Sequence, residues 1–371
     1  MLLAGAAGCS SDDDAPDGGD TVVVAADLNN ASAVDLAYAR ALQLRIEQIN
    51  NSGQLGERKL ELRTQDNRND PTVSLRNIST FGDDPAVAAV IGGICDSCVV
   101  GAAKTINDKR LPTISLAASD EVVNPVAERQ YIFKLGPNSA DSAATLVNEF
   151  TRTGIKKIAV LHTNDLYGRG ANAALTDARG SGITATATRA VKTAASDITQ
   201  AVGALTDTDP QALVVLTPPD LAQQAATDAR AAGFRGSIYF DSAAASDLFI
   251  PRAAVRATDN ATMVFTQILA IDDVIATTPA KSSRKQWFRD YTSRYGSYSG
   301  VASFAADAVD LIADAVARVG ADRPAIREII ETSQVDGLSG PIRLTPDNHS
   351  GLMPQALTLL VARSGRWRLA S

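Results

Sequence analysis

Two cysteines three positions apart are the residues of this sequence with the clearest chemical potential. Cys95 and Cys98 lie in VIGGICDSCVVGAA, between an apolar run and a segment with helical periodicity. Because a thiol at a helix N-terminus ionises readily, the pair could do redox work. It could also supply half of a metal site, or form a disulfide brace beside a binding crevice. The pattern by itself leaves these three possibilities open.

Other residue patterns for catalysis are sparse. A zinc site would have to bring His162 and His349, which lie far apart in the sequence, to the two cysteines. The sequence contains no P-loop, no Gly-x-Ser-x-Gly elbow and no cysteine with an evident histidine partner. We therefore predict a protein that is not an enzyme and that needs no metal and no cofactor. A thiol-disulfide oxidoreductase is the enzymatic alternative.

Length and charge limit the class of protein further. The chain has 371 residues, of which 45% are hydrophobic, and this length allows two lobes with cores of their own. A net charge of -7 argues against nucleic acid as a partner, because a polyanion would favour a basic face. Beyond the extreme N-terminus, no apolar run approaches the roughly 18 residues of a membrane helix.

The first 20 residues, MLLAGAAGCSSDDDAPDGGD, combine a small-residue run that ends in a cysteine with an acidic, Gly/Pro/Ser-rich stretch. This segment resembles a bacterial lipoprotein signal, and Cys9 matches the cysteine that becomes lipidated. The resemblance implies a signal remnant and a disordered tether over residues 1–20. It also implies an extracytoplasmic protein, anchored by its lipid to the outer face of the cell membrane or periplasmic, with no other membrane contact. Disulfides persist in such a compartment.

The elements that must position any site alternate between strands and helices. From Thr21 onward, apolar runs predict strands at residues 21–28, 59–66, 86–94 and 111–119, with amphipathic helices between them. The first helix has one apolar face made of Val34, Tyr38, Leu42, Ile46 and Ile49, and Asp70-Pro71 is typical of a helix start. This alternation predicts an α/β fold with a parallel sheet covered by helices on both faces.

The same rhythm starts again after residues 131–142, which we interpret as a chain crossing. Strands are predicted at residues 156–163, 183–191, 212–217 and 237–242, with a helix that ends near Ala201 and another over residues 221–233. Three helical patterns follow at residues 282–295, 301–319 and 323–332. A last strand pair surrounds Ser364-Gly365, which is typical of a hairpin turn. Two α/β units of similar size are therefore expected.

Several of these segments together resemble the leucine/isoleucine/valine-binding family of ABC-transporter substrate-binding proteins. They are INNSGQLGERKLELRTQDNRNDP, VIGGICDSC, LPTISLAAS, YIFKLGPNSADS, KKIAVLHTNDLYGRG and TDARAAGF. The resemblance implies the type I periplasmic-binding fold, with two Rossmann-like lobes, parallel central sheets and three hinge crossings. Lobe 1 would comprise residues 21–137 and 266–346, and lobe 2 residues 138–265 and 347–371. Ligands of open α/β sheets bind beyond the carboxyl ends of the strands, here between the lobes.

The family's function and partners follow from the same resemblance. It implies a solute-binding protein of an ABC importer that is a monomer. Such a protein holds a small polar metabolite, an amino acid or a related compound, and delivers it to ABC permease subunits. A ligand-sensing domain of the same fold that serves no transporter is the alternative.

The resemblance also implies which residues bind the ligand. The groups that hold a ligand carboxylate fall on Asp96 or Ser97, Ala117 and Ser119, and a cleft tyrosine of the second lobe falls on Tyr167. The ammonium-binding acid falls on Asp241 or Ser242. The expected set is Asp96, Ser97, Ala117, Ser119, Tyr167, Thr217, Asp241 and Ser242.

Three positions depart from the family pattern. Asp96 replaces a serine, and Pro218 replaces a second cleft tyrosine whose space Thr217 partly fills. The family disulfide joins the cysteine that matches Cys95 to an upstream one, where this chain has Asn69. Cys98 is then the available partner, so the resemblance favours a Cys95–Cys98 disulfide. A standard branched-chain amino acid is in doubt as the ligand, and another amino acid, an amide or a cationic small molecule remains open.

Overall fold

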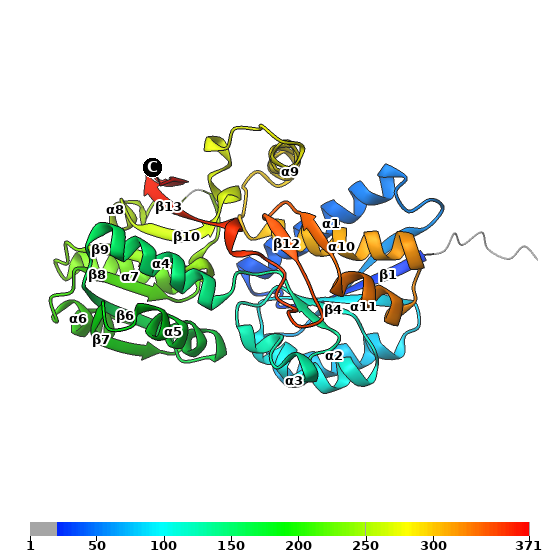
Figure 1. Cartoon of the computed structure of the whole chain (residues 1–371), viewed down its shortest axis with the longest axis horizontal. Helices are drawn as coiled ribbons and strands as arrows, with labels where there is room; N and C mark the ends of the chain where they lie inside the picture. The colour runs from blue at the N-terminus through cyan, green and yellow to red at the C-terminus, as the bar shows by residue number, and fades with distance from the viewer. Residues whose placement is uncertain (1–20, 249, 371) are drawn as a thin grey trace, which may run out of the picture.

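A five-stranded sheet and a seven-stranded sheet form the centres of two lobes that lie side by side in the computed structural model (Figure 1). The structure describes residues 21–248 and 250–370. The predicted lipidation site at Cys9 and the predicted tether over residues 1–20 lie outside the described residues. The α/β class and the two parallel-sheet lobes predicted from the sequence are confirmed.

Lobe 1 is built on a wholly parallel sheet with the strand order β2-β1-β3-β4-β5. Its strands are β1 (Thr21–Leu28), β2 (Lys59–Asp66), β3 (Val87–Gly92), β4 (Thr113–Ser115) and β5 (Ile132–Lys134). The inner strands β1 and β3 are almost continuous apolar runs because helices cover both faces of the sheet. The connecting helices are α1 (Ala33–Ser52), α2 (Pro71–Asp83) and α3 (Asp96–Asp108), with the short 3-10 turns η1 (Asp120–Val122) and η2 (Val126–Glu128) after β4.

The helix boundaries in lobe 1 follow from local capping. The Ser32 side chain accepts the N–H of Asp35 at the start of α1, and Gly53 ends this helix with a φ of 76°, which favours glycine. Asp70 caps α2 in the same way, and Pro71 occupies the first turn. The end of α1 before Gly53 and the start of α2 at Pro71 agree with the sequence prediction. The buried face of α1 contains four of its five predicted apolar residues, while Val34 is partly buried and faces the region between the lobes.

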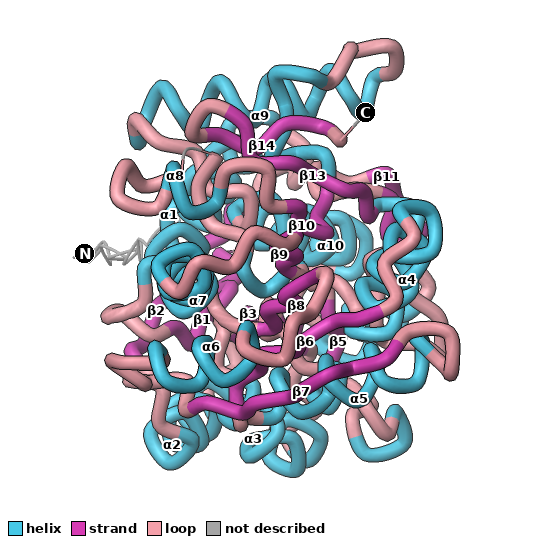
Figure 2. The backbone as a smooth tube through the Cα atoms, turned by 90° about the vertical axis from the view of Figure 1, so that its left-hand side faces the viewer, coloured by secondary structure: helices cyan, strands magenta, loops and turns pink. Residues whose placement is uncertain are grey.

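Lobe 2 has the strand order β14-β13-β10-β9-β8-β6-β7, which Figure 2 shows from the outer side of the lobe. The strands β6 to β10 pair in parallel, and β13 and β14 complete the sheet as antiparallel strands. The strands are β6 (Lys157–Thr163), β7 (Thr184–Val191), β8 (Ala212–Leu216), β9 (Ser237–Phe240), β10 (Thr262–Thr266), β13 (Leu357–Arg363) and β14 (Arg366–Leu369). The helices are α4 (Ser139–Thr153), α5 (Leu166–Arg179), α6 (Thr199–Thr206), α7 (Pro219–Ala231) and α8 (Val255–Thr258), with η3 (Ser242–Ala244) after β9.

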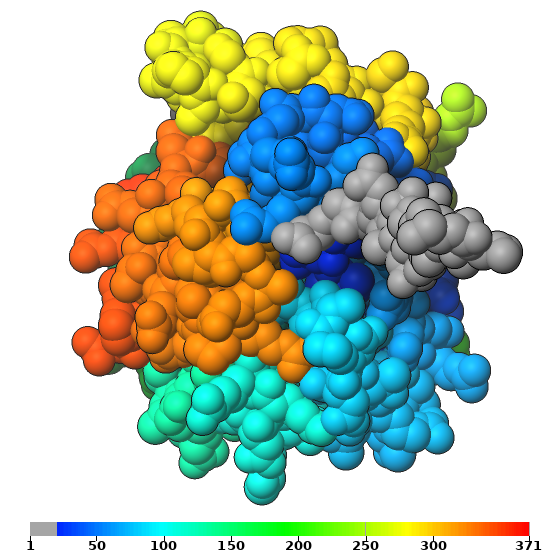
Figure 3. Space-filling view, turned by 90° about the vertical axis from the view of Figure 1, so that its right-hand side faces the viewer, coloured from blue at the N-terminus to red at the C-terminus, as the bar shows by residue number. Residues whose placement is uncertain are grey.

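The chain returns to lobe 1 after β10 and η4 (Gln267–Asp273). There, α9 (Pro279–Tyr295), α10 (Ala302–Val319) and α11 (Arg323–Glu331) precede the hairpin of β11 (Gln334–Asp336) and β12 (Pro341–Arg343). α10 packs on α1, where the Arg45 side chain pairs with Asp310 at 2.6 Å. Figure 3 shows this outer face, on which α1 in blue lies beside the yellow α9 and the orange helices. η5 (Pro354–Ala356) leads the chain back to β13.

One local prediction was wrong. The helix expected to end near Ala201 instead begins at Thr199 and continues to Thr206, and the Asp197 carboxylate just before it accepts the N–H of Thr199. The segment interpreted as a chain crossing does lead from the five-stranded sheet to α4, which packs on α5 and β13. Its first part also forms β5, which has only three residues and is too short for a periodic signal. The predicted Ser364-Gly365 hairpin turn is confirmed, since both residues have a positive φ between β13 and β14.

A buried polar cluster joins two of the three chain crossings. The Lys134 ammonium is wholly buried at the end of β5 and donates to the Asp120 carboxylate at 2.9 Å and to the Pro137 carbonyl at 2.7 Å. The other Asp120 oxygen accepts the N–H of Ser139, the first residue of α4. The Lys134 backbone bonds with His349 and Gly351 on the chain that returns to β13. The lobe limits after residues 137, 265 and 346 stay a prediction.

Candidate functional site

A cavity of about 250 Å³ lies between the two lobes, where the carboxyl ends of both parallel sheets meet. Lobe 1 contributes residues that follow β2, β3, β4 and β5, and lobe 2 contributes residues that follow β6 to β9. The wall is mostly apolar. It consists of Val34, Tyr38, Asn69, Ile94, Cys95, Asp96, Ser97, Leu116, Ala117, Ala118, Gly136, Pro137, Asp165, Leu166, Tyr167, Thr193, Pro218, Pro219, Ser242, Ala243, Ala245, Phe265, Val301 and Phe304.

Cys95 and Cys98 form a disulfide at the lobe 1 side of the cavity, with their Cα atoms 5.2 Å apart. Cys95 is the N-cap residue of α3, and its Sγ accepts the N–H of Cys98 at 3.2 Å. Both side chains are buried, and Cys95 also lines the cavity. The bond closes the first turn of α3 and holds the loop that carries Asp96 and Ser97.

The carboxylate of Asp96 turns toward the loop after β4. One of its oxygens accepts the N–H of Ser119 at 2.7 Å, and the N–H of Ala118 also bonds with this carboxylate. Burial raises the pKa of Asp96 to about 7, and the nearby Asp165 carboxylate adds to the rise. The two backbone bonds and the Lys134 ammonium act in the opposite direction. Asp96 therefore changes its charge near neutral pH.

A second buried carboxylate, that of Asp35, lies behind the cavity wall and positions two of its loops. Asp35 accepts the N–H of Asn29 at 2.6 Å and the N–H of Ile94 at 3.0 Å, so it connects the loops after β1 and β3. Burial raises the pKa of Asp35 to about 6. One turn later in α1, the Tyr38 hydroxyl donates to the Leu116 carbonyl at 3.2 Å. Both contacts fix the loops whose residues line the cavity.

Lobe 2 contributes a tyrosine that is itself held by a buried acid. The Tyr167 hydroxyl donates to the carboxylate of Asp241, and Asp241 also accepts the N–H of Ala243 as the cap of η3. Burial raises the pKa of Asp241 to about 7, although the bond from Tyr167 lowers it. Asp165 caps α5 by accepting the N–H of Gly168 at 2.8 Å. A Cβ at Gly168 would lie 2.1 Å from the Thr163 carbonyl oxygen, so this turn requires glycine.

The structure brings five of the eight predicted ligand-binding residues to the cavity wall: Asp96, Ser97, Ala117, Tyr167 and Ser242. The other three lie beneath the wall. The Ser119 hydroxyl caps η1 by accepting the N–H of Glu121, and the Thr217 hydroxyl donates to the Pro218 carbonyl at 3.2 Å. Asp241 is 2% exposed and supports the cavity wall through its bonds with Tyr167 and Ala243.

Sequence reasoning missed three of the four aromatic residues of the wall. Tyr38 matched the apolar face of its helix and was interpreted as core, while Phe265 and Phe304 lie in segments that gave no site signal. Asp165 and Thr193 follow β6 and β7 directly, so the rule that ligands bind beyond strand ends could have found them. Asn69 lines the cavity with a φ of 55° in the loop after β2.

The histidines take no part in this site. His349 is buried beside β5 and α11, where its Nε2 lies 3.0 Å from the Glu331 carboxylate and its Nδ1 2.8 Å from the Ile132 carbonyl. The His162 Nδ1 bonds with the Thr163 carbonyl in β6. Within residues 21–248 and 250–370, no cluster of three or more His, Cys, Asp or Glu side chains could hold a metal ion. Nor does any helix in these ranges have the length and apolar character to cross a membrane.

Two α/β lobes with a cavity at their facing strand ends define a two-lobed binding protein. The sequence profile of the periplasmic binding protein family matches residues 29–366. The chain therefore belongs to the periplasmic binding protein family, which confirms the family indicated by its sequence motifs. A comparison with curated proteins found no significant match.

Solved structures share the fold at low sequence identity. An extracellular ligand-binding receptor from Rhodopseudomonas palustris HaA2 has a TM-score of 0.84 and 20% identity, covering 94% of this chain and 99% of that chain. An ABC transporter substrate-binding protein from Desulfitobacterium hafniense, in complex with Leu, has a TM-score of 0.77 and 20% identity, covering 94% of this chain and 100% of that chain. A leucine-binding protein from Thermotoga maritima MSB8 has a TM-score of 0.78 and 18% identity, covering 94% of this chain and 98% of that chain.

Proposed function

We propose that the protein is an extracytoplasmic solute-binding protein of an ABC importer, which holds an amino acid or a related small polar metabolite between its lobes. The observation that carries this proposal is the interlobe cavity, whose walls come from both lobes. A ligand that contacts both walls stabilises the closed arrangement of the lobes, which a permease can then recognise.

The size of the cavity sets the size of the ligand. At about 250 Å³ it lies just below the roughly 300 to 1,000 Å³ of sites for drug-sized ligands, which favours a compact metabolite. The family membership and the similarity to an ABC transporter substrate-binding protein support the transport role. In this proposal Cys9 carries the lipid anchor, and residues 10–20 tether the lobes to the membrane surface.

A thermal-shift screen of amino acids, amides, amines and small carboxylates tests ligand binding. A ligand at a hundredfold excess over its dissociation constant stabilises the protein by about 2.7 kcal/mol, and X-ray scattering should show compaction with the same compound. Ala118→Trp, which projects a large side chain from the cavity wall, should abolish the shift. Ala173→Trp, on the exposed face of α5, is the matched control and should retain it.

The proposal fails if no compound in the screen raises the melting temperature or compacts the protein. The transport role needs a separate measurement. The ligand-loaded protein should stimulate ATP hydrolysis by its reconstituted permease complex, whereas the Ala118→Trp variant should not. A protein that binds its ligand but stimulates no permease would be a sensing domain of the same fold.

A further inference from the structure

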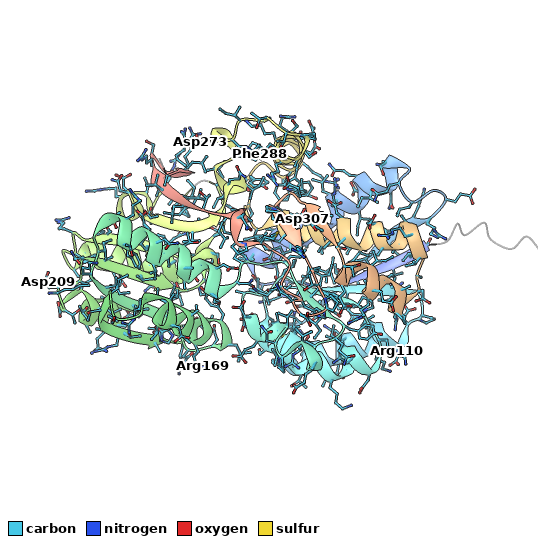
Figure 4. The ribbon with its side chains drawn as sticks, viewed as in Figure 1. Arg110, Arg169, Asp209, Asp273, Phe288 and Asp307 are labelled. Atoms are coloured by element: carbon cyan, nitrogen blue, oxygen red, sulfur yellow. A yellow bond between two sulfur atoms is a disulfide. The ribbon has the colours of Figure 1, made fainter. Side chains whose placement is uncertain are left out.

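The charged groups on the wall of the interlobe cavity all have the same sign. Of the described residues that line it, Asp96 and Asp165 carry carboxylates, and none is Lys, Arg or His. Arg169, in the first turn of α5, bonds with the Asn164 carbonyl, and Figure 4 shows it on the surface of lobe 2. The Lys134 ammonium is buried behind the wall among Asp120, Gly136, Pro137 and Asn138.

The backbone donors that could receive an anionic ligand group after β4 are already occupied. The N–H of Ser119 donates to Asp96 at 2.7 Å, the N–H of Ala118 also bonds with Asp96, and the N–H of Ala117 donates to the Ser115 hydroxyl at 3.2 Å. The Asp96 side chain thus takes the place that a ligand carboxylate would need. A carboxylate brought to this wall would meet a like charge and bonded amides.

We propose that the ligand is an organic ammonium ion with a compact apolar body and no carboxylate, and that Asp96 is its counter-ion. This inference rests on the proposed function and names the ligand class of the same cavity. Asp165 is less suited to direct pairing, because its oxygens accept three bonds, from the N–H of Gly168 and the hydroxyls of Thr163 and Thr193. Asp96 accepts two. The charge of Asp165 still favours a cation in the cavity.

The rest of the wall fits such a ligand. Four aromatic side chains line the cavity, namely Tyr38, Tyr167, Phe265 and Phe304. Aromatic faces attract ammonium groups, and aromatic edges and aliphatic side chains accommodate an apolar body. The hydroxyl groups of Tyr38 and Tyr167 donate to Leu116 and Asp241, so these rings present mainly their apolar surface to the ligand.

The pH dependence of binding distinguishes an ammonium ligand from a carboxylate ligand. The charged or titratable groups near Asp96 are Asp165, Lys134, Tyr38 and Tyr167. Because the pKa of free Asp96 is about 7 and a bound cation favours its ionised form, affinity for an ammonium ligand should rise about tenfold from pH 6 to pH 8. A carboxylate ligand would favour the protonated form, so its affinity would fall over the same range.

Isothermal titration calorimetry with three matched compounds tests the proposal. We would use 2-phenylethylamine, 3-phenylpropanoate and phenylalanine, and then the corresponding series with an isobutyl body in place of the phenyl ring. The amine of at least one series should bind at least tenfold more tightly than its carboxylate and its amino acid. Asp96→Asn should weaken amine binding at least tenfold and remove its pH dependence, with an unchanged circular dichroism spectrum.

Two further variants sharpen the test. Asp96→Ser frees the N–H groups of Ala118 and Ser119 and should shift the preference from the amine toward the amino acid. Asp108→Asn, an exposed aspartate paired with Lys104 at the other end of α3, is the matched control and should leave affinity unchanged. Tighter binding of a carboxylate or an amino acid to the unaltered protein, or no amine binding in either series, overturns the ligand class but not the proposed function. The proposed ligand binding fails if the broader screen finds no ligand at all, and the proposed transport role fails if the loaded protein stimulates no permease.

Discussion

The hydroxyl of Tyr167, in the first turn of α5, donates a hydrogen bond to the carboxylate of Asp241 at the end of β9. Both side chains are at least 95% buried, and the bond joins two segments that are 74 residues apart in the sequence. Tyr167 faces the cavity, whereas Asp241 supports it from below. We infer that Asp241 positions Tyr167.

Removing the Tyr167 hydroxyl should destabilise the protein in a pH-dependent way. Tyr167→Phe removes the side-chain donor of the buried Asp241 carboxylate, at a cost of about 1 to 3 kcal/mol. The bond favours the ionised form of Asp241, whose pKa is about 7, so the loss should be larger at pH 8.5 than at pH 6. Urea denaturation at both pH values measures it.

Asp241→Asn is the companion variant, because its amide oxygen still accepts a bond from Tyr167 but carries no charge. It should show little of this pH dependence and should weaken ligand affinity less than Asp96→Asn. Loss of binding in Asp241→Asn as complete as in Asp96→Asn would instead place Asp241 in direct contact with the ligand.

The Cys95–Cys98 disulfide should contribute little to global stability and more to ligand affinity. Loop closure over so few residues stabilises by about 2 kcal/mol in the chain-entropy model. Without the bond, the loop that carries Asp96 and Ser97 must be ordered each time a ligand binds. The double variant Cys95→Ser/Cys98→Ser should therefore bind its ligand more weakly, with a small change in melting temperature.

Thiol counting checks the oxidation state directly. With Cys9→Ser to remove the third thiol, denatured protein should label no cysteine before reduction and two after it. Two reactive thiols without reductant, or unchanged affinity in the double variant, would contradict the brace and reopen the redox and metal interpretations.

Several buried aspartates should make the ligand-free protein less stable as the pH rises. Asp307, on α10, accepts the N–H groups of Leu338 at 2.6 Å and Ser339 at 2.8 Å, and burial raises its pKa to about 7. A carboxyl group with a raised folded-state pKa stabilises fully below about pH 4, and this contribution is lost as the pH rises to about 7. Asp35, Asp96 and Asp241 act in the same direction.

The melting temperature should therefore fall between pH 5 and pH 8. Asp307→Asn should lower it at pH 5, because the amide nitrogen cannot accept a bond from Ser339, but should make the fall with pH shallower. Figure 4 shows Asp307 near the centre of the molecule, away from the exposed Asp209 at the far end of lobe 2. Asp209→Asn is accordingly the control and should leave the slope unchanged. An equal slope in Asp307→Asn and the unaltered protein would refute the role of Asp307.

The sequence by itself determined the elements and their class. Apolar periodicity and local capping depend on residues a few positions apart, so α1, the start of α2 and most of the longer strands could be predicted close to their observed limits. The three-residue strands β4 and β5 could not. Strand ends then indicated where a site would lie. The resemblance to the family then predicted Asp96, Ser97, Ala117, Tyr167 and Ser242 as site residues, and all five line the cavity.

Only the tertiary structure decided which side chains face the cavity and which support it. Asp241 and Ser119 follow their strands as Ser242 and Ala117 do, yet contacts with Tyr167 and Glu121 hold them below the wall. The packing of α10 against lobe 1 brings Phe304 to a cavity that its sequence position does not suggest. These choices depend on contacts between residues far apart in the chain, which local propensity does not encode. The direction of the Asp96 carboxylate, toward the amides of the next loop, is of this kind and sets the charge of the site.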